Sequence, residues 1–145
     1  MELFCGAGTL TVPIRAQYPE GTWVATDCNA VALEELAERL DDWKIETVLG
    51  AHPLDLEEDN WDQVDVVLMD PPREGAKEWM ERIEEAAPQW VMYISCNPLT
   101  QVRDLEMLPD GMYELSALYS YDMFPMTGHM ETLAILRRNE KGEGQ

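Results

Sequence analysis

The chain of 145 residues has few basic side chains and very little lysine. Ten Lys and Arg residues stand against 29 Asp and Glu residues, the formal net charge is −19, and the lysines are Lys44, Lys77 and Lys141. This balance argues against binding nucleic acid by charge alone, because phosphate contacts depend on Lys and Arg, and against docking on an anionic membrane. Such a surface fits a high-salt cytoplasm and equally a soluble domain of no special habitat. In both cases we expect added salt to relieve self-repulsion.

Cysteine and long apolar runs are also scarce. The three cysteines are Cys5, Cys28 and Cys96. They are widely spaced and form no CxxC pair, so we expect no disulfide framework or zinc ribbon, and a reducing, cytoplasmic compartment. The chain has no run of about 18 apolar residues that would span a bilayer, and no signal-peptide pattern at its start. Its two histidines lack ligand spacing, so no metal is expected.

The composition is that of one globular domain. Apolar residues make up 46% and charged residues 27% of the chain, a typical globular balance, and the length suits a single domain. No internal repeat or linker divides the chain. We therefore expect one domain over residues 1–138 and a flexible, polar tail over residues 139–145.

Two kinds of segment alternate along the chain. Strands are predicted at residues 1–5, 22–26, 45–49, 64–69, 90–95, 113–121 and 132–138. Helices are predicted at residues 10–18, 29 to about 42, 76–87 and 98–108, with Asp27 or Asn29 as the cap of the second. The nearly all-apolar strands 64–69 and 90–95 indicate burial on both faces. The alternation predicts an α/β, doubly wound, mostly parallel sheet with helices on both faces.

The first predicted strand has only about four residues before a glycine turn, although this strand is central in such a sheet. We therefore expect the first strand to be truncated and the chain to be a piece of a longer protein.

In doubly wound sheets ligands bind at the carboxyl ends of the strands, where this sequence has a glycine turn and an aspartate. Gly6 and Gly8 let a ligand approach the backbone; a tight loop without a ligand is the alternative. Thr11 replaces the third glycine of a dinucleotide fingerprint, which favours a nucleoside ligand without a pyrophosphate, such as S-adenosylmethionine. Asp27, about twenty residues on, suits the ribose hydroxyls or, alternatively, a helix N-cap.

Two further motifs follow buried strands. Asp70-Pro71-Pro72-Arg73 is a stiff strand exit. Enzymes that methylate exocyclic amines often have an aromatic residue where Arg73 stands, so amine methylation is disfavoured and a phosphate or carboxylate contact favoured. Cys96 opens a helix, where nearby N–H groups can stabilise a thiolate.

The alternative for Cys96 is a buried structural thiol, which is also what we expect of Cys5 and Cys28. Glu131 lies at the entry to the last predicted strand and could act as a general base, or it is an exposed acid at a strand end. His129, two residues earlier, is expected to be structural.

Together these segments resemble the catalytic domain of RNA uracil-C5 methyltransferases, which use S-adenosylmethionine. The matching pieces occur in the family's order and cover nearly the whole chain. They are Glu2–Thr11, Ala25–Asp27, Asp70–Gly75, Tyr93–Pro98 and Asp122–Pro125 with Thr127, His129 and Glu131.

The resemblance implies a class I methyltransferase with a Rossmann-like, doubly wound, mostly parallel seven-stranded sheet. It implies methyl transfer from S-adenosylmethionine to C5 of a uridine in structured RNA, either tRNA or rRNA, without a metal. Cys96 would be the nucleophile and Glu131 the base. The implied cofactor residues are Phe4, Thr9, Asp27 and Asp70, with Gly6 and Gly8 forming the turn beneath the cofactor.

The chemistry explains these residue types. Uracil C5 is a weak nucleophile, and attack of a thiolate at C6 produces an enolate with electron density at C5. A base must then remove the C5 proton so that the thiolate can leave. The uridine must also leave its stack to reach the thiol.

The family usually carries an RNA-binding β-barrel domain before this catalytic domain, and these residues include none. We therefore expect the chain alone to bind RNA weakly and to need an upstream RNA-binding domain. The alternatives to an active methyltransferase are a truncated or silent module that binds cofactor or a partner protein, and a methyltransferase for a small substrate. Both oligomeric state and the choice of RNA are left open by the sequence.

Overall fold

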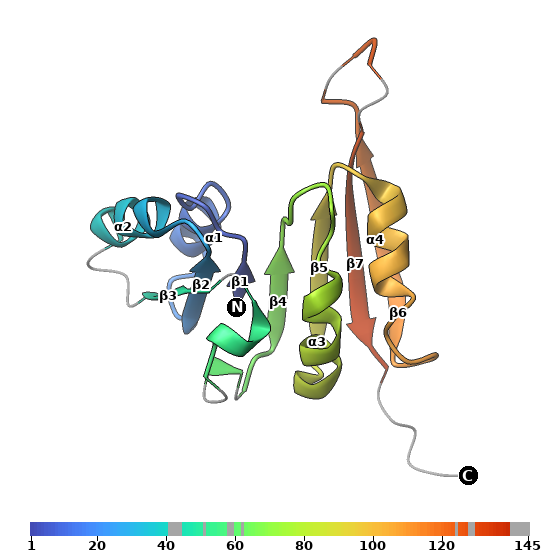
Figure 1. Ribbon diagram of the computed structural model, residues 1–145, viewed down its shortest axis with the longest axis horizontal. Helices are drawn as coiled ribbons and strands as arrows, with labels where there is room; N and C mark the ends of the chain where they lie inside the picture. Colours follow the sequence, from blue (N-terminus) through green and yellow to red (C-terminus); the bar gives the residue numbers. More distant parts are fainter. Residues whose placement is uncertain are drawn as a thin grey trace.

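The computed structural model describes residues 1–40, 45–50, 52–57, 60–61, 63–123, 125–127 and 130–139. The strands form one seven-stranded sheet in the order β3-β2-β1-β4-β5-β7-β6 (Figure 1). The strands are β1 (Glu2–Leu3), β2 (Trp23–Asp27), β3 (Ile45–Leu49), β4 (Val66–Met69), β5 (Trp90–Ser95), β6 (Tyr113–Tyr121) and β7 (Glu131–Arg138). β1 to β5 pair in parallel, whereas β7 is antiparallel to both β5 and β6. The predicted α/β, doubly wound, mostly parallel sheet is confirmed.

The two-residue strand β1 occupies the centre of this sheet. Leu3 is fully buried and is aligned with Thr26 of β2 on one side and Met69 of β4 on the other. The order of the strands reverses between β1 and β4, and ligands bind at such a switch point in doubly wound sheets. A ligand site is therefore expected at the segments that follow β1 and β4.

The helices are close to those predicted, with differences at their ends. They are α1 (Thr11–Gln17), α2 (Ala30–Arg39), α3 (Met80–Ala86) and α4 (Pro98–Leu105), with 3-10 helices η1 (Pro53–Asp55) and η3 (Lys77–Trp79). α2 ends at Arg39, before the end predicted near Asp42, which lies outside the described residues. No helix within the described residues has the length and apolar character needed to cross a bilayer.

Local hydrogen bonds explain these ends. Asn29, rather than Asp27, caps α2, because its side-chain oxygen accepts from the N–H groups of Val31 and Ala32. The helix predicted over residues 76–87 divides into η3 and α3, and the Trp79 N–H bonds to the carbonyl three residues back, at Ala76 (2.9 Å). The end of α4 tightens in the same way after Leu105, so that this helix is shorter than predicted.

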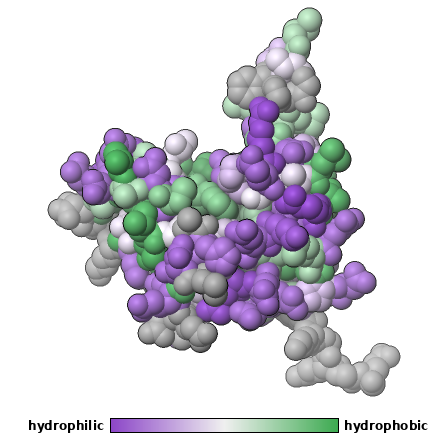
Figure 2. Space-filling model, in the orientation of Figure 1, coloured by the Kyte–Doolittle hydropathy of each residue, from purple (hydrophilic) through white to green (hydrophobic). Residues whose placement is uncertain are grey.

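The larger core cluster lies between the sheet and the segment from η3 to α3. Trp79, Met80 and Ile83 are buried against β4 and β5, including Val67 and Tyr93. A second cluster joins α2 to β2 and the turn after β1. Figure 2 shows hydrophilic side chains over the middle of one face of the molecule, as the excess of acidic residues leads one to expect.

The prediction that strand 90–95 is buried on both faces is wrong for one of them. Val91, Tyr93 and Ser95 are buried, but the alternate residues, Met92 among them, are only half-buried. Met92 is aligned with Ile135 of β7, which is also half-buried. The helices beside these strands in the described residues, α3 and α4, both lie on the same side of the sheet (Figure 1), so the other face keeps contact with water.

Candidate active site

The turn after β1 has a backbone that favours glycine. Phe4, Gly6 and Gly8 have φ of 61°, 53° and 83°. A Cβ on Gly8 would lie 2.3 Å from Cδ1 of Leu36 on α2, so a larger residue would have to displace that buried side chain, and the positive φ of Gly8 also favours glycine. Phe4 is half-buried with its ring edge-on to Trp79 (centroids 5.7 Å apart), whereas Thr9 is exposed.

Asp27 connects the end of β2 to this glycine turn. Its Oδ2 accepts a hydrogen bond from the Gly6 N–H, and its Oδ1 accepts one from the Asn29 N–H (both 2.9 Å). Each carboxylate oxygen can accept a further bond. The helix-cap alternative for Asp27 is therefore wrong, because Asn29 caps α2, and the Asp27 carboxylate lies beside the turn.

Glu2 lies in β1, ahead of the glycine turn, and sequence reasoning gave it no role of its own. It is buried, and its Oε2 accepts bonds from the Thr11 hydroxyl (2.7 Å) and the Trp23 indole N–H (3.3 Å). Burial raises the pKa of Glu2, and the two hydrogen bonds oppose that shift. The signal in the sequence was an acidic residue within an otherwise apolar first strand.

Asp70 and Glu131 lie close enough for their charges to interact. Asp70 is exposed, but desolvation by neighbouring atoms raises its pKa, and the negative charge of Glu131 raises it further. Asp70 directly follows β4, and Glu131 is the first residue of β7. The structure therefore brings together two of the predicted site residues, which are separated by β5 in the order of the sheet.

Cys96 directly follows β5, and Glu131 is the first residue of β7, which pairs with β5. The last aligned pair in this ladder is Ser95 with Thr132, so Cys96 and Glu131 each lie one residue beyond it, at the same end of the two strands. Both residues are half-buried. This is the end of the sheet at which Asp70 follows β4.

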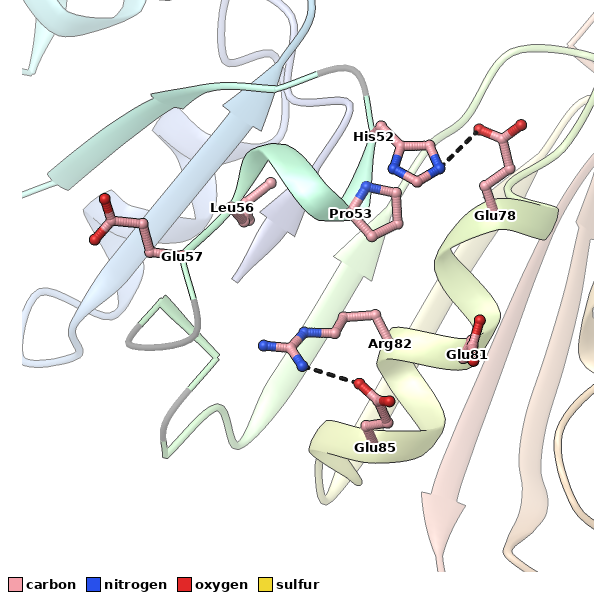
Figure 3. Close-up of a pocket in the computed structure, with 8 residues that line it drawn as sticks. All are labelled: His52, Pro53, Leu56, Glu57, Glu78, Glu81, Arg82 and Glu85. Carbon is pink, nitrogen blue, oxygen red and sulfur yellow. Dashed lines mark hydrogen bonds and ion pairs between the residues drawn. The ribbon is translucent and has the colours of Figure 1, made fainter.

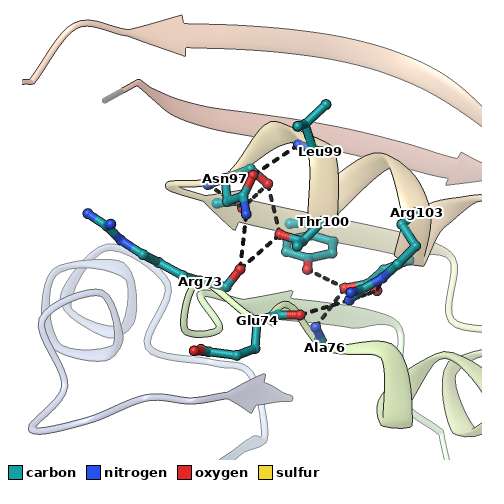
Figure 4. A network of polar contacts seen from close by, with 10 residues as sticks. Arg73, Glu74, Ala76, Asn97, Leu99, Thr100 and Arg103 are labelled. Atoms are coloured by element: carbon teal, nitrogen blue, oxygen red, sulfur yellow. Dashed lines mark hydrogen bonds and ion pairs between the residues drawn. The ribbon is translucent and has the colours of Figure 1, made fainter. Parts of the chain in front are cut away.

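The loop after Asp70 is tied to the start of α4 (Figure 4). The carbonyl oxygen of Arg73 accepts bonds from the Asn97 amide and the Thr100 hydroxyl (both 3.2 Å). The Asn97 side chain also caps α4 by accepting from the Leu99 N–H. In Figure 4 the Arg73 guanidinium extends away from this cluster, so the loop holds its backbone fixed while the cationic group points outward.

The three cysteines differ in environment. Cys96 is half-buried, whereas Cys5 is buried and has its pKa raised to about 12 by that burial, so it is an inert thiol as expected. The expectation that Cys28 is buried is wrong: it is exposed, because it lies in the turn between β2 and α2. Within the described part of the chain, no group of three or more His, Cys, Asp or Glu residues could hold a metal ion.

A separate pocket of about 550 Å³ lies between η1 and α3 (Figure 3). Its lining residues are His52, Pro53, Leu56, Glu57, Glu78, Glu81, Arg82 and Glu85. None of the predicted site residues belongs to it, and its polar contacts include a His52–Glu78 pair (3.8 Å) and an Arg82–Glu85 pair (2.9 Å). Of the motif that ends at Glu131, Phe124 and His129 lie outside the described residues.

Comparison with known sequences gives one consistent group of relatives. A family model described as tRNA (uracil-5-)-methyltransferase matches residues 29–139. The 23S rRNA (uracil(1939)-C(5))-methyltransferase RlmD of Aeromonas hydrophila is 39% identical over 144 residues, which cover 95% of this chain and 32% of that protein. An uncharacterized RNA methyltransferase of Bdellovibrio bacteriovorus is 31% identical over 94% of this chain and 36% of its own length. The chain thus spans about a third of these relatives.

Solved structures agree with the sequences. Pyrococcus abyssi tRNA (uracil-54, C5)-methyltransferase, solved in complex with S-adenosyl-L-homocysteine, superposes with a TM-score of 0.74 at 26% identity, over 93% of this chain and 33% of that one. A methyltransferase structure from Thermoplasma acidophilum has a TM-score of 0.70 at 12% identity, over 97% of this chain and 67% of that one. The latter likeness shows the shared fold alone.

Proposed function

The chain belongs to the tRNA (uracil-5-)-methyltransferase family, and we propose that it transfers a methyl group from S-adenosylmethionine to C5 of a uridine in structured RNA. The observation that supports this proposal is that Asp70, Cys96 and Glu131 all lie at the carboxyl end of β4 and β5, where the charge of Glu131 acts on Asp70. A thiol and a carboxylate at the same end of neighbouring strands suit the two adjacent carbons of one pyrimidine ring.

Cys96 is proposed to attack C6 of the uracil as a thiolate. The new carbon–sulfur bond moves electron density to C5, which then takes the methyl group. Glu131 next removes the C5 proton, the C5–C6 double bond forms again, and the electron pair of the carbon–sulfur bond returns to the Cys96 sulfur. The protein therefore needs a nucleophile and a base in contact with one base ring, and the β5–β7 register supports that arrangement.

The turn after β1 suits the nucleoside part of S-adenosylmethionine. The positive φ of Gly6 and Gly8 brings bare backbone to the end of β1. Each oxygen of the Asp27 carboxylate has capacity for a second hydrogen bond besides the one described, and we propose that ribose hydroxyls donate to it. We propose Phe4, Thr9 and Asp70 as the remaining cofactor contacts. When bound, the cofactor supplies an electrophilic methyl group on a sulfonium.

RNA is the proposed substrate, and the relatives named above act on both rRNA and tRNA. The net charge of −19 gives this chain little attraction for phosphate, so we propose that an RNA-binding domain outside these residues supplies most of the affinity. Three free cysteines suit a reducing compartment, and we propose the cytoplasm. The sequence alternative of a silent cofactor-binding module is not favoured, because the chain retains the cysteine and the two carboxylates that the proposed chemistry needs.

The proposal is tested by the loss of hydrogen from C5. RNA transcribed with [5-³H]uridine releases tritium to water when C5 is methylated, and mass spectrometry of the digested RNA identifies the product as 5-methyluridine. At high RNA concentration, we expect release by the unmodified chain and by Cys28→Ser, the exposed-cysteine control. We expect Cys96→Ser to lower the rate at least about 10³-fold, as loss of a nucleophile does. Undiminished release by Cys96→Ser, or a methyl group on another atom, would refute the mechanism.

A further inference from the structure

We propose that Asp104, a buried carboxylate on α4, is a positioning residue that fixes the loop carrying Asp70 relative to the strand end carrying Cys96. This inference deepens the proposed function, because it gives the spacing of Asp70 and Cys96 a defined cause. In the sequence Asp104 follows Arg103 in a polar helix and looks like a solvent-exposed acid.

The Asp104 carboxylate accepts hydrogen bonds from three parts of the chain. Its Oδ2 accepts from the Ala76 N–H (2.6 Å) in the loop after Asp70 and from the Tyr93 hydroxyl (2.7 Å) on β5. Its Oδ1 accepts from Arg103 on its own helix, through Nε (2.9 Å) and Nη2 (2.5 Å). Its exposed fraction is 0%. A carboxylate so enclosed is held only if its charge is paired and its oxygens are satisfied.

The same cluster holds the loop at further points (Figure 4). Arg103 Nη2 also donates to the carbonyl oxygen of Glu74 (2.8 Å). Between the two held residues lies Gly75, with φ of 85°, where a Cβ would be 2.4 Å from Asp104 Oδ2. A side chain at position 75 would therefore meet the Asp104 carboxylate and the Arg103 guanidinium, so the close approach of the loop to this cluster depends on glycine there.

The two segments that Asp104 connects, the loop after Asp70 and the end of β5, both adjoin proposed site residues. The loop begins at Asp70 and is stiffened by Pro71 and Pro72. Tyr93 precedes Cys96 by three residues, and α4 begins two residues after it. Burial and the neighbouring Asp104 raise the pKa of Tyr93, so its phenol keeps its proton and remains a donor. Buried ion pairs contribute little to stability in many proteins. The role that fits this cluster is to hold the loop after Asp70 in a fixed position relative to β5.

The test compares Asp104→Asn with Glu114→Gln. Glu114 also pairs with an arginine, Arg137 (2.5 Å), but across β6 and β7. For Asp104→Asn we expect kcat for tritium release to fall about 10²-fold, as a misplacement of about 1 Å can cost. We expect the Kd for S-adenosylmethionine to rise by a much smaller factor, because Asp70 is one of several proposed cofactor contacts. We also expect faster hydrogen exchange at the Ala76 amide. Glu114→Gln should change none of these quantities.

Two outcomes would overturn the proposal: kcat unchanged despite faster exchange at Ala76, or a fall in kcat accompanied by an equal loss of cofactor affinity. If Asp104→Asn does not fold, Tyr93→Phe decides, because it removes one donor and keeps the carboxylate; we expect a several-fold fall in kcat, and no change would refute the role.

Failure of the proposed function can be recognised separately. If the unmodified chain releases no tritium, two other measurements still report whether Asp104 holds the loop after Asp70 against the end of β5. They are hydrogen exchange at the Ala76 amide and the rate of alkylation of Cys96, both measured in a Cys28→Ser background. An alkylation rate and an exchange rate that are both unaffected by Asp104→Asn would then refute the positioning role alone.

Discussion

Ser95 of β5 and Thr132 of β7 are the last aligned pair in their ladder, and the Thr132 hydroxyl donates a hydrogen bond to the Ser95 carbonyl oxygen (3.2 Å). Both residues are buried. The register of the two strands is therefore fixed immediately before Cys96 and Glu131. A slip of one residue would place the thiol and the carboxylate on opposite faces of the sheet, so this buried pair bears directly on the proposed chemistry.

The proposed base can be tested by Glu131→Gln. Removing the carboxylate should lower tritium release about 10²- to 10⁴-fold, the usual contribution of a general base. Attack by Cys96 does not require this group, so a covalent RNA–protein adduct should accumulate and be visible on a denaturing gel. Glu114→Gln is the control on the neighbouring strand. Normal release, or no adduct despite slow release, would show that Glu131 is not the base.

The glycine turn can be tested by Gly8→Ala with Gly111→Ala as its match. Both glycines have positive φ, 83° and 75°, but a Cβ on Gly8 would collide with Leu36, whereas one on Gly111 would meet nothing within 4 Å. We expect Gly111→Ala to cost about 1 kcal/mol in unfolding free energy, and Gly8→Ala to cost about 2–4 kcal/mol because overpacking is added. Urea unfolding measures both costs, and equal values would contradict the packing described for α2.

The buried Glu2 predicts a pH dependence of stability. The pKa of Glu2 is raised above 4.5 in the folded chain. At pH values between the pKa of the unfolded chain and that of the folded chain, the unfolded chain has lost the proton while the folded chain keeps it, so rising pH favours unfolding. Relative to Glu2→Gln, the unmodified chain should lose unfolding free energy as pH rises from 5, and the difference should level off above the raised pKa.

Urea unfolding at several pH values between 5 and 8 tests this prediction. Glu114→Gln, which removes one surface charge, serves as the control. A difference between the unmodified chain and Glu2→Gln that stays constant, or that changes in the opposite direction, would mean that Glu2 is not desolvated as described.

The net charge of −19 predicts that salt stabilises the fold. Raising KCl from 0.1 to 1 M shortens the screening length from about 10 to about 3 Å, which weakens repulsion among the acidic side chains. We expect Tm to rise with KCl and equally with NaCl, as measured by circular dichroism. A Tm that is flat or falls with both salts would contradict this reading of the charge.

Much of the fold could be predicted because periodicity and turn chemistry are local. The strands at residues 45–49, 90–95 and 113–121 were predicted with the bounds that the structure has. Burial of a second face is not local, since it depends on which helices cover it, and the sequence of β5 gives no sign that Met92 is only half-buried. Cys28 was misjudged for the same reason, because a thiol in a turn has no periodic pattern.

The candidate site shows the same limit. The positions of the motifs predicted that Asp70 and Cys96 would lie at strand ends, and the family resemblance added Glu131. The structure places Asp70 within reach of the Glu131 charge. The roles of these residues stay predictions. Asp104 could not have been found from the sequence, because an acid in a polar helix resembles a hydrated one until β5 and the loop after Asp70 enclose it.

The shortness of β1 has a mechanical consequence. The glycine turn and Asp27 belong to one half of the sheet and Cys96 and Glu131 to the other. The short segment Met1–Cys5 joins β2 to β4 by main-chain hydrogen bonds and strand pairing. A ligand that contacts both Asp27 and Cys96 would bind both halves of the sheet across this short strand and hold them together. Binding of such a ligand should then make the two halves of the sheet unfold together in one thermal transition.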